Sequence, residues 1–135
     1  MKRLISTYYS GFAFNLATFV LRIGLGVLMV PHGYDKLVQF AKYKKEFMDF
    51  MGLGSTFSLL LVIFAEFFCA IFLVMGLFTR LAAFALLVTM AVASFKAHNG
   101  EIFGDGEMAT LYLSGFTAIL LLGAGKASLD GILGK

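Results

Sequence analysis

Three ionisable residues stand in or beside stretches that are otherwise apolar, namely Arg22, His32 and Glu66. A charge at mid-depth of a bilayer costs at least about 2.5 to 3.5 kcal/mol, so such side chains face the protein interior and are paired or functional. Glu66 can change its protonation state at mid-membrane, and His32 can exchange protons with the outer aqueous phase. We therefore assign the candidate catalytic roles to Arg22, Glu66 and His32, as parts of a short proton path that ends beside an apolar pocket.

Counting along the chain puts Arg22 and Glu66 at the same depth. Arg22 lies ten residues before His32, and Glu66 lies eleven residues after Ser55, where the next apolar stretch begins. At a rise of about 1.5 Å per residue, each lies roughly 15 to 16 Å from the outer surface of a hydrocarbon core about 30 Å thick. We predict an Arg22–Glu66 ion pair, direct or through a water molecule, which either serves the chemistry or only locks two neighbouring helices together.

Further residues are predicted to surround this pair. If the first helix continues past its proline, Gly26 and Lys36 share the face of Arg22, and a glycine lets a ligand or another helix approach the backbone closely. Thr89 and Thr117 lie far enough inside the third and fourth apolar segments to reach the same depth. The candidate cofactor-binding residues are Gly26, Lys36, Thr89, His98 and Thr117.

The polar residues expected at the outer mouth do not have the spacing of a metal motif. Imidazole and carboxylate groups are suitable zinc ligands, and His32, Asp35, His98, Asp105 and Glu107 are expected to gather there. Because their spacing matches no such motif, we interpret them as helix caps and interfacial hydrogen-bonding groups and expect no metal site. A bis-histidine haem between His32 and His98 is a weaker alternative, since nothing else in the sequence marks a haem pocket.

The composition is that of an integral membrane protein. Of 135 residues, 60% are hydrophobic and 14% are charged, and the mean hydropathy is +0.90, whereas about 25% of the residues of an ordinary globular domain are charged. The lipid bilayer is therefore an expected partner. The charges are spread through short loops, which argues against nucleic-acid binding. The single Cys69 cannot form an intramolecular disulfide, which argues against thiol exchange by this chain alone.

The apolar segments predict one all-α domain over residues 1–135, a bundle of four transmembrane helices. The predicted spans are residues 12–31, 57–78, 80–97 and 108–125. Pro31 predicts a kink or the end of the first helix. Residues 37–51 combine an aromatic stripe with lysines and acids, which is typical of an amphipathic helix lying in the interface.

Charge fixes the orientation only through the N-terminus. Apart from Arg22, the two sides of the predicted bundle carry five basic residues each. Lys2 and Arg3 precede the first span, and the acidic loop that follows the third span lies opposite, so we place both termini in the cytoplasm.

The ordered motifs along the chain resemble those of the DoxX/DoxD-like family of small four-helix membrane proteins. They are Arg22-Ile23-Gly24-Leu25-Gly26, Pro31-His32-Gly33-Tyr34-Asp35-Lys36-Leu37, Glu66 with Met75-Gly76-Leu77-Phe78-Thr79-Arg80, the loop around His98, Glu107, and Gly123-Ala124-Gly125-Lys126-Ala127-Ser128-Leu129-Asp130. The resemblance covers nearly the whole chain. It implies a bundle in a prokaryotic inner membrane, and an association with quinone-linked oxidation of sulfur compounds or with oxidative-stress and quinone-resistance systems, often beside soluble redox partners.

Three functions are open on these grounds. The first is a membrane component of a redox system that binds a quinone or a similar apolar molecule near Arg22, Glu66 and His32, for example as a subunit of a quinone-linked oxidoreductase. The second is a transporter or channel subunit for protons or a small solute, which in a chain of this size would act as a homo-oligomer. The third is a non-catalytic membrane scaffold in which the polar layer is structural.

Overall fold

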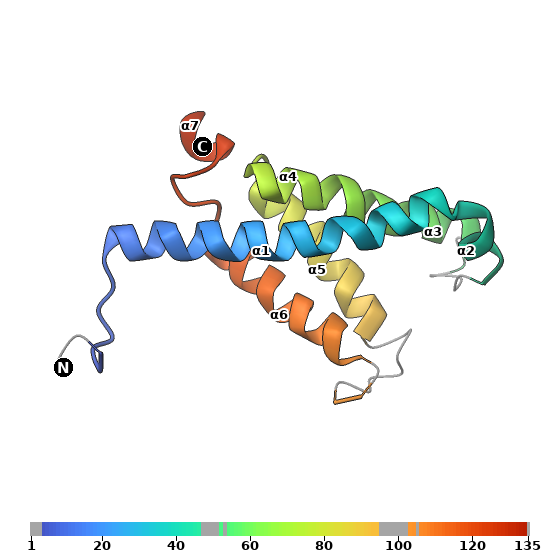
Figure 1. The fold of residues 1–135 in the computed structure, drawn as a ribbon, viewed down its shortest axis with the longest axis horizontal. Coiled ribbons are helices and arrows are strands. Elements are labelled where there is room, and N and C mark those ends of the chain that lie inside the picture. Colours follow the sequence, from blue (N-terminus) through green and yellow to red (C-terminus); the bar gives the residue numbers. More distant parts are fainter. Residues whose placement is uncertain (1–3, 47–51, 53, 95–102, 105, 135) are drawn as a thin grey trace.

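The structure, a computed structural model, describes residues 4–46, 52, 54–94, 103–104 and 106–134. All regular structure in these residues is helical. The long helix α1 (Gly11–Val38) runs the length of the molecule, the run from α3 to α4 lies beside it, and α5 and α6 cross it obliquely (Figure 1). The prediction of an all-α protein is thereby confirmed.

Helix α1 starts at a conventional cap and continues through its proline. The Ser10 hydroxyl accepts a hydrogen bond from the backbone N–H of Ala13 at 3.1 Å, which satisfies one of the unpaired donors at the helix start. Pro31 lies inside the helix, which ends seven residues later at Val38. Of the two alternatives expected at Pro31, the helix end is therefore wrong, and the kink stays a prediction. A proline removes one backbone donor, a loss that helices in membranes tolerate.

The second predicted segment is an uninterrupted helical run with a change of pitch in its middle. It consists of α3 (Ser55–Ile63), the π-helical segment η1 (Phe64–Cys69) and α4 (Ala70–Met75). Segments of π-helix inside α-helices are rare and occur frequently at functional sites. Glu66 lies within this π-helical segment.

The remaining helices differ from the predictions at their ends, and residues 95–97 of the third predicted span lie outside the described part of the chain. Helix α5 covers Thr79–Val92, α6 covers Glu107–Leu122, and α2 covers Phe40–Glu46 where an interfacial helix over residues 37–51 was predicted. The beginning of that prediction is wrong, because residues 37 and 38 complete α1, and its residues 47–51 lie outside the described part of the chain. A final helical turn, α7 (Leu129–Ile132), was not predicted.

Two helical runs in the described residues are long and apolar enough to cross a membrane. They are Gly11–Val38 and Thr56–Met75. Helix α6 is apolar but has 16 residues, about 24 Å against a hydrocarbon core of about 30 Å. Helix α5 is also apolar and has 14 residues up to Val92, and the described chain continues from there only to residue 94. The arrangement of four spans therefore stays a prediction.

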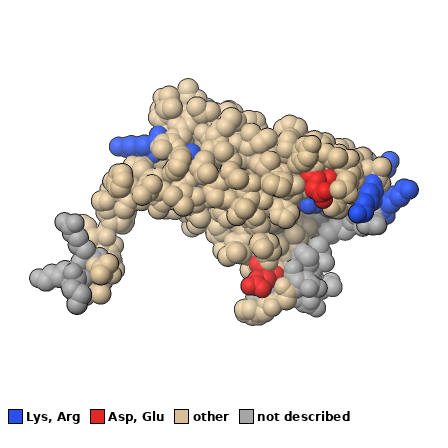
Figure 2. All heavy atoms as spheres, in the orientation of Figure 1, with Lys and Arg blue, Asp and Glu red and all other residues tan. Residues whose placement is uncertain are grey.

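Charged side chains gather at the ends of the molecule. In Figure 2 basic residues lie toward both ends of the face shown, and the acidic residues between them are confined to one patch near the right-hand basic group and one on the lower edge. Large apolar side chains are exposed along the helices, among them Leu16, Val20, Val27, Leu60 and Phe84. Water would not favour such a surface, whereas lipid chains would cover it.

Close backbone contact sets the register between α1 and the α3–α4 run. A Cβ atom added to Gly33 would lie 2.5 Å from the backbone nitrogen of Phe67, and one added to Gly26 would lie 3.1 Å from the carbonyl oxygen of Ala70. Residues later in α1 thus contact residues earlier in the α3–α4 run, so the two run antiparallel. The buried residues of α1 form a single stripe, consisting of Thr18, Arg22, Gly26, Met29 and Gly33.

The middle of the bundle is a dry apolar layer. Leu73, Leu86 and Phe116 come from α4, α5 and α6, and each has an exposed fraction of 0%. Helices α5 and α6 pack on each other through this layer. Side chains in such an interior are closely packed, so the layer separates the two ends of the bundle.

We predict that Gly33→Ala destabilises the protein whereas Gly24→Ala does not. The added Cβ at Gly33 meets backbone atoms of η1, which cannot move aside as a flexible side chain can, and overpacking typically costs about 1 to 3 kcal/mol. Gly24 has nothing within 4 Å of an added Cβ. Unfolding of both variants in detergent measures the difference, and equal stability of the two variants would contradict the close α1–η1 contact.

Candidate functional site

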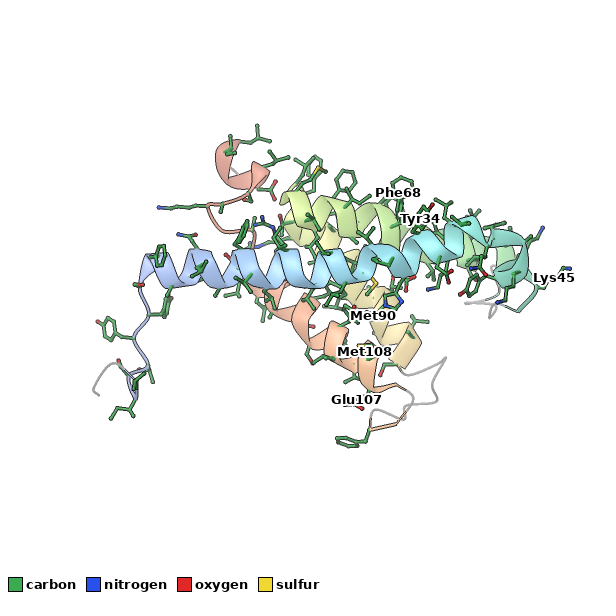
Figure 3. The ribbon with its side chains drawn as sticks, in the orientation of Figure 1. Tyr34, Lys45, Phe68, Met90, Glu107 and Met108 are labelled. Carbon is green, nitrogen blue, oxygen red and sulfur yellow. The ribbon has the colours of Figure 1, made fainter. Side chains whose placement is uncertain are left out.

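A cavity of about 840 Å³, here called the central cavity, lies among α1, α3, η1, α5 and α6. Most of its wall is apolar, and Met90 of α5 and Met108 of α6 are labelled beside it in Figure 3. The lining residues are Met29, His32, Lys36, Ser58, Leu61, Val62, Phe64, Ala65, Glu66, Phe84, Ala85, Val88, Thr89, Met90, Val92, Ala93, Met108, Ala109 and Tyr112. An apolar cavity with a few polar groups is the usual form of a small-molecule site.

An ion pair forms part of the wall of the central cavity. The Nζ atom of Lys36 lies 2.7 Å from Oε2 of Glu66, and the two side chains are 19% and 8% exposed. Lys36 comes one turn after Gly33, whose contact with η1 brings the lysine over the carboxylate. Removing two charges from water costs free energy that their mutual attraction repays only in part, so this ion pair is weak evidence for a role in stability. Because the pair lies in the cavity wall, a bound molecule could reach its polar atoms.

An aromatic and an imidazole group complete the polar part of the cavity. Tyr112 is buried, with an exposed fraction of 7%, and its ring meets the ring of His32 edge-on at a centroid distance of 6.1 Å. The imidazole of His32 and the hydroxyl of Tyr112 have no hydrogen-bond partner among the residues that the structure describes. Both groups are therefore available to a bound molecule.

The short helix α2 packs against α3 and lies beside Lys36. Gln39 donates a hydrogen bond from Nε2 to Oδ1 of Asp35 at 2.7 Å, and the Tyr43 hydroxyl donates to the other carboxylate oxygen. The ring of Tyr43 also lies 5.9 Å from the ammonium of Lys36, within the range of a cation–π contact. Asp35 thus anchors α2, while the neighbouring Lys36 reaches inward to Glu66.

Arg22 does not pair with Glu66, so this prediction is wrong. Its guanidinium donates from Nη1 to the carbonyl of Ala124 at 2.6 Å and from Nη2 to the carbonyl of Ala127 at 2.8 Å. Arg22 is 2% exposed and does not line the central cavity. Its role in the structure is to hold the segment that follows α6.

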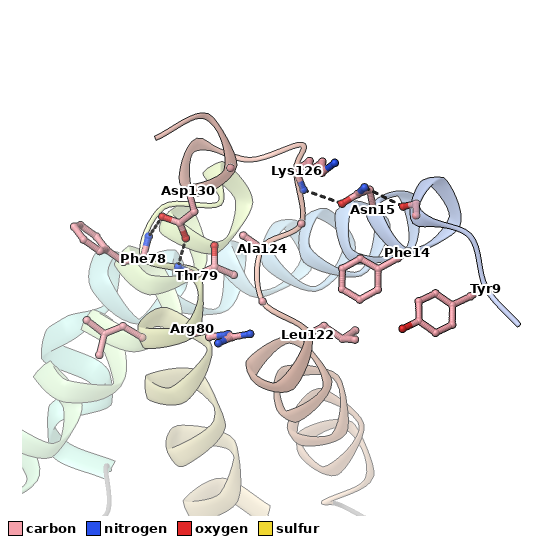
Figure 4. Close-up of a pocket in the computed structure, with 15 residues that line it drawn as sticks. Tyr9, Phe14, Asn15, Phe78, Thr79, Arg80, Leu122, Ala124, Lys126 and Asp130 are labelled. Carbon is pink, nitrogen blue, oxygen red and sulfur yellow. Dashed lines mark hydrogen bonds between the residues drawn. The ribbon is translucent and has the colours of Figure 1, made fainter. Parts of the chain in front are cut away.

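This C-terminal segment, residues 123–132, is fastened at three further points. The Asp130 carboxylate accepts hydrogen bonds from the backbone N–H groups of Phe78 and Thr79 at 3.0 and 2.9 Å, at the start of α5 (Figure 4). The Asp130 N–H donates to the carbonyl of Gly76 at 2.9 Å. On the other side, Oδ1 of Asn15 accepts from the Lys126 N–H. The segment therefore connects α1, the α4–α5 turn and α6.

The wrong pairing has a simple cause. The depth of Arg22 was counted from a helix end near Pro31, but α1 continues to Val38. In the observed register an added Cβ at Gly76 would lie 3.0 Å from Cζ of Arg22, so the arginine is level with Gly76, ten residues beyond Glu66. Ten residues of helix correspond to about 15 Å, too far for an ion pair.

The predicted cofactor-binding residues are distributed over several environments. Lys36 and Thr89 line the central cavity, although the Thr89 hydroxyl already donates to the carbonyl of Ala85. Gly26 packs against α4, and the Thr117 hydroxyl donates to the carbonyl of Leu113, so neither lines the cavity. His98 lies outside the described residues.

Two residues escaped the sequence reasoning. Tyr112 contributes its side chain to the wall of the central cavity, and a tyrosine within an otherwise apolar helix was the available signal. Asp130 caps the start of α5 although the two are about fifty residues apart in the sequence. A local sequence pattern does not predict such a contact. The motif from Gly123 to Asp130 supported only the family resemblance, whereas the carbonyls of Ala124 and Ala127 within it bind Arg22.

We predict that Arg22→Met loosens the C-terminal segment. The substitution leaves the carbonyls of Ala124 and Ala127 without their donors, at a cost on the order of 2 kcal/mol. Faster hydrogen exchange at the amides of Thr79 and Asp130 is the expected result, measured by mass spectrometry. The matched control is Lys44→Met in α2, which should leave exchange at these amides unchanged; unchanged exchange in Arg22→Met as well would contradict the proposed role.

The amino-acid sequence is similar to those of known membrane proteins. The model of the DoxX family matches residues 17–99, which include Arg22, Lys36, Glu66 and Thr89. The chain is similar to an uncharacterized protein of Haemophilus influenzae (strain Rd), with 35% identity over 119 residues that cover 82% of this chain and 85% of that protein. No solved structure matches the chain. The protein belongs to the DoxX family of membrane proteins.

Proposed function

We propose that this protein is a membrane component of a redox system and binds a quinone, or a similar molecule with a polar head and an apolar body, in the central cavity. The observation that carries the proposal is the Lys36–Glu66 ion pair in the wall of an otherwise apolar cavity. His32 and Tyr112 stand beside this pair. A buried ionisable pair at membrane depth is costly, which favours a functional role.

The groups in the cavity suit the chemistry of a quinone head. Its carbonyl oxygens accept hydrogen bonds, and the Lys36 ammonium and the Tyr112 hydroxyl are donors. Glu66 and His32 are groups that can hold and pass a proton. When bound, a quinone accepts electrons together with protons, so a site that reduces it needs a proton source within reach. The cavity volume of about 840 Å³ lies in the range of ligand sites, about 300 to 1,000 Å³.

The apolar layer below the cavity favours ligand binding over transport. Leu73, Leu86 and Phe116 belong to the apolar core between the central cavity and the level of Arg22, and each has an exposed fraction of 0%. A proton or solute pathway through the bundle would need a continuous polar or hydrated route. The central cavity supports a site that is entered from one end of the bundle or from the lipid.

We propose further that the chain crosses the prokaryotic inner membrane four times with both termini in the cytoplasm. The beginning of α1 and the turn α7 lie at the same end of the molecule (Figure 1), as an even number of spans requires. A separate redox protein, soluble or in the membrane, would supply the electrons. Helix α6 has 16 residues, fewer than a span usually needs, which suits local thinning of the bilayer or contact with a second copy in a homo-oligomer.

We predict that Glu66→Gln weakens binding of a short-chain benzoquinone at least about tenfold. The substitution removes the charge that holds Lys36 in place and a proton-carrying group, and hydrogen bonds to charged groups are worth about 1.5 to 3 kcal/mol. Equilibrium dialysis of the purified protein in detergent measures the dissociation constant. Glu107→Gln, which changes an exposed glutamate at the start of α6, is the matched control.

The variants Glu107→Gln and Arg22→Met distinguish the central cavity from the site around Arg22 that the sequence analysis predicted. Glu107→Gln and Arg22→Met should bind the benzoquinone with the affinity of the unmodified protein, because neither residue lines the central cavity. Unchanged affinity in Glu66→Gln would remove the central cavity as the site. Loss of affinity in Arg22→Met with full affinity in Glu66→Gln would move the site to the level of Arg22.

A second prediction tests whether the Lys36–Glu66 ion pair binds a ligand or only stabilises the fold. Lys36→Met and Glu66→Leu each leave a buried charge without a partner, which costs about 3 to 5 kcal/mol, whereas the double variant restores most of the stability. We expect the double variant to remain unable to bind the benzoquinone. Unfolding in detergent and dialysis are measured on the same samples, and a stable double variant that binds normally would favour a purely structural pair.

A further inference from the structure

A second cavity, of about 910 Å³ and here called the terminal cavity, opens at the end of the bundle that carries both the start of α1 and the C-terminal segment. Its walls come from elements far apart in the sequence (Figure 4). The lining residues are Tyr9, Gly11, Phe14, Asn15, Phe78, Thr79, Arg80, Leu81, Leu122, Gly123, Ala124, Gly125, Lys126, Asp130 and Gly131. The dry layer of the bundle separates it from the central cavity.

The guanidinium group of Arg80 lines the terminal cavity and is available to bind a ligand. No hydrogen bond or ion pair joins this side chain to another residue in the described part of the chain. It lies against Gly123, where an added Cβ would be 3.2 Å from Nη2, and Figure 4 shows it reaching toward Leu122. A guanidinium has five donors in a fixed fork that matches the oxygens of a phosphate group, and here they face the cavity.

A buried hydroxyl without a partner lies beside this arginine. Thr79 is 1% exposed, and its Oγ1 atom has no hydrogen-bond partner in the described residues. Its backbone N–H is already used by the Asp130 carboxylate, so the start of α5 is capped from within the protein. Unpaired buried polar atoms are uncommon in folded proteins and point to a missing partner, such as a ligand oxygen.

The wall of the terminal cavity contains both basic and apolar side chains. Lys126, exposed on the C-terminal segment, adds a second positive charge at the rim. The side chains of Phe14, Leu81 and Leu122 supply apolar wall, and Leu81 and Leu122 are exposed toward the surroundings of the bundle. A ligand that satisfies both parts carries an anionic group and an apolar body, and the surrounding bilayer contains such molecules at high concentration.

We propose that the terminal cavity binds the phosphate group of an anionic phospholipid, with Arg80 as the main contact, Lys126 as a second charge and the acyl chains along Leu81 and Leu122. Free inorganic phosphate shares the chemistry of the head group but gains nothing from the apolar wall. The lipid would close the gap between the start of α5 and the C-terminal segment. This proposal does not rest on the function proposed for the central cavity.

The test compares lipids retained by the full chain. The protein is reconstituted in nanodiscs containing equal amounts of phosphatidylglycerol and phosphatidylcholine, released into mild detergent, and analysed by native mass spectrometry. We expect the unmodified protein to retain phosphatidylglycerol preferentially and Arg80→Gln to lose about fivefold of this preference, the factor typical of one cation near an anionic membrane surface. Arg80→Lys, which keeps the charge without the fork, should lose less.

Lys44→Gln is the matched control, because it removes an exposed positive charge from α2, at the other end of the bundle. The proposal is overturned if the unmodified protein retains both lipids equally, or if Lys44→Gln loses as much preference as Arg80→Gln. Excess inorganic phosphate is added to the detergent sample in a further arm. Displacement of the retained phosphatidylglycerol by phosphate alone would overturn the assignment to a lipid and assign the site to a soluble phosphate group.

Discussion

The close antiparallel contact between α1 and the α3–α4 run is the constraint on which the rest of the structure depends. Gly26 and Gly33 allow the backbones to approach so closely that a side chain at Gly33 would overlap the backbone of η1. This contact places Lys36 over Glu66 at one end of the helix and Arg22 beside Gly76 at the other. Without it, neither Arg22 nor Lys36 would meet the partner that it has.

The two basic residues of α1, the buried Arg22 and the partly buried Lys36, have different surroundings. Arg22 is held by two carbonyl groups of the C-terminal segment and contacts no cavity suited to chemistry. Lys36 shares a cavity wall with a carboxylate, an imidazole and a phenol, several of whose polar atoms have no partner in the described residues. A dry layer that includes Phe116 separates the two levels. The arginine therefore stabilises the fold, and the lysine is the better candidate for function.

The turn between α4 and α5 shows how the family motifs act together. Gly76 adopts a left-handed conformation with φ of 74°, and an added Cβ would lie 2.3 Å from Cβ of Ser128. Phe78 also has a positive φ, of 48°, which is unfavourable for a residue with a side chain. The Asp130 carboxylate binds the N–H groups at this turn and compensates for the strain. Residues that are distant in the sequence thus form one structural unit around Arg22.

The sequence by itself determined the class of protein, the approximate helices, the inward face of α1 and the placement of Glu66 inside a helix. These features depend on composition and on the period of a single helix, which are local properties. The partners of Arg22, Glu66 and Asp130 were decided only by the tertiary structure. Depth counted along one helix does not fix its register against another, because that register depends on where two backbones can touch. Here the register of α1 against the α3–α4 run is set by the backbone contact at Gly33 and by the extension of α1 beyond Pro31.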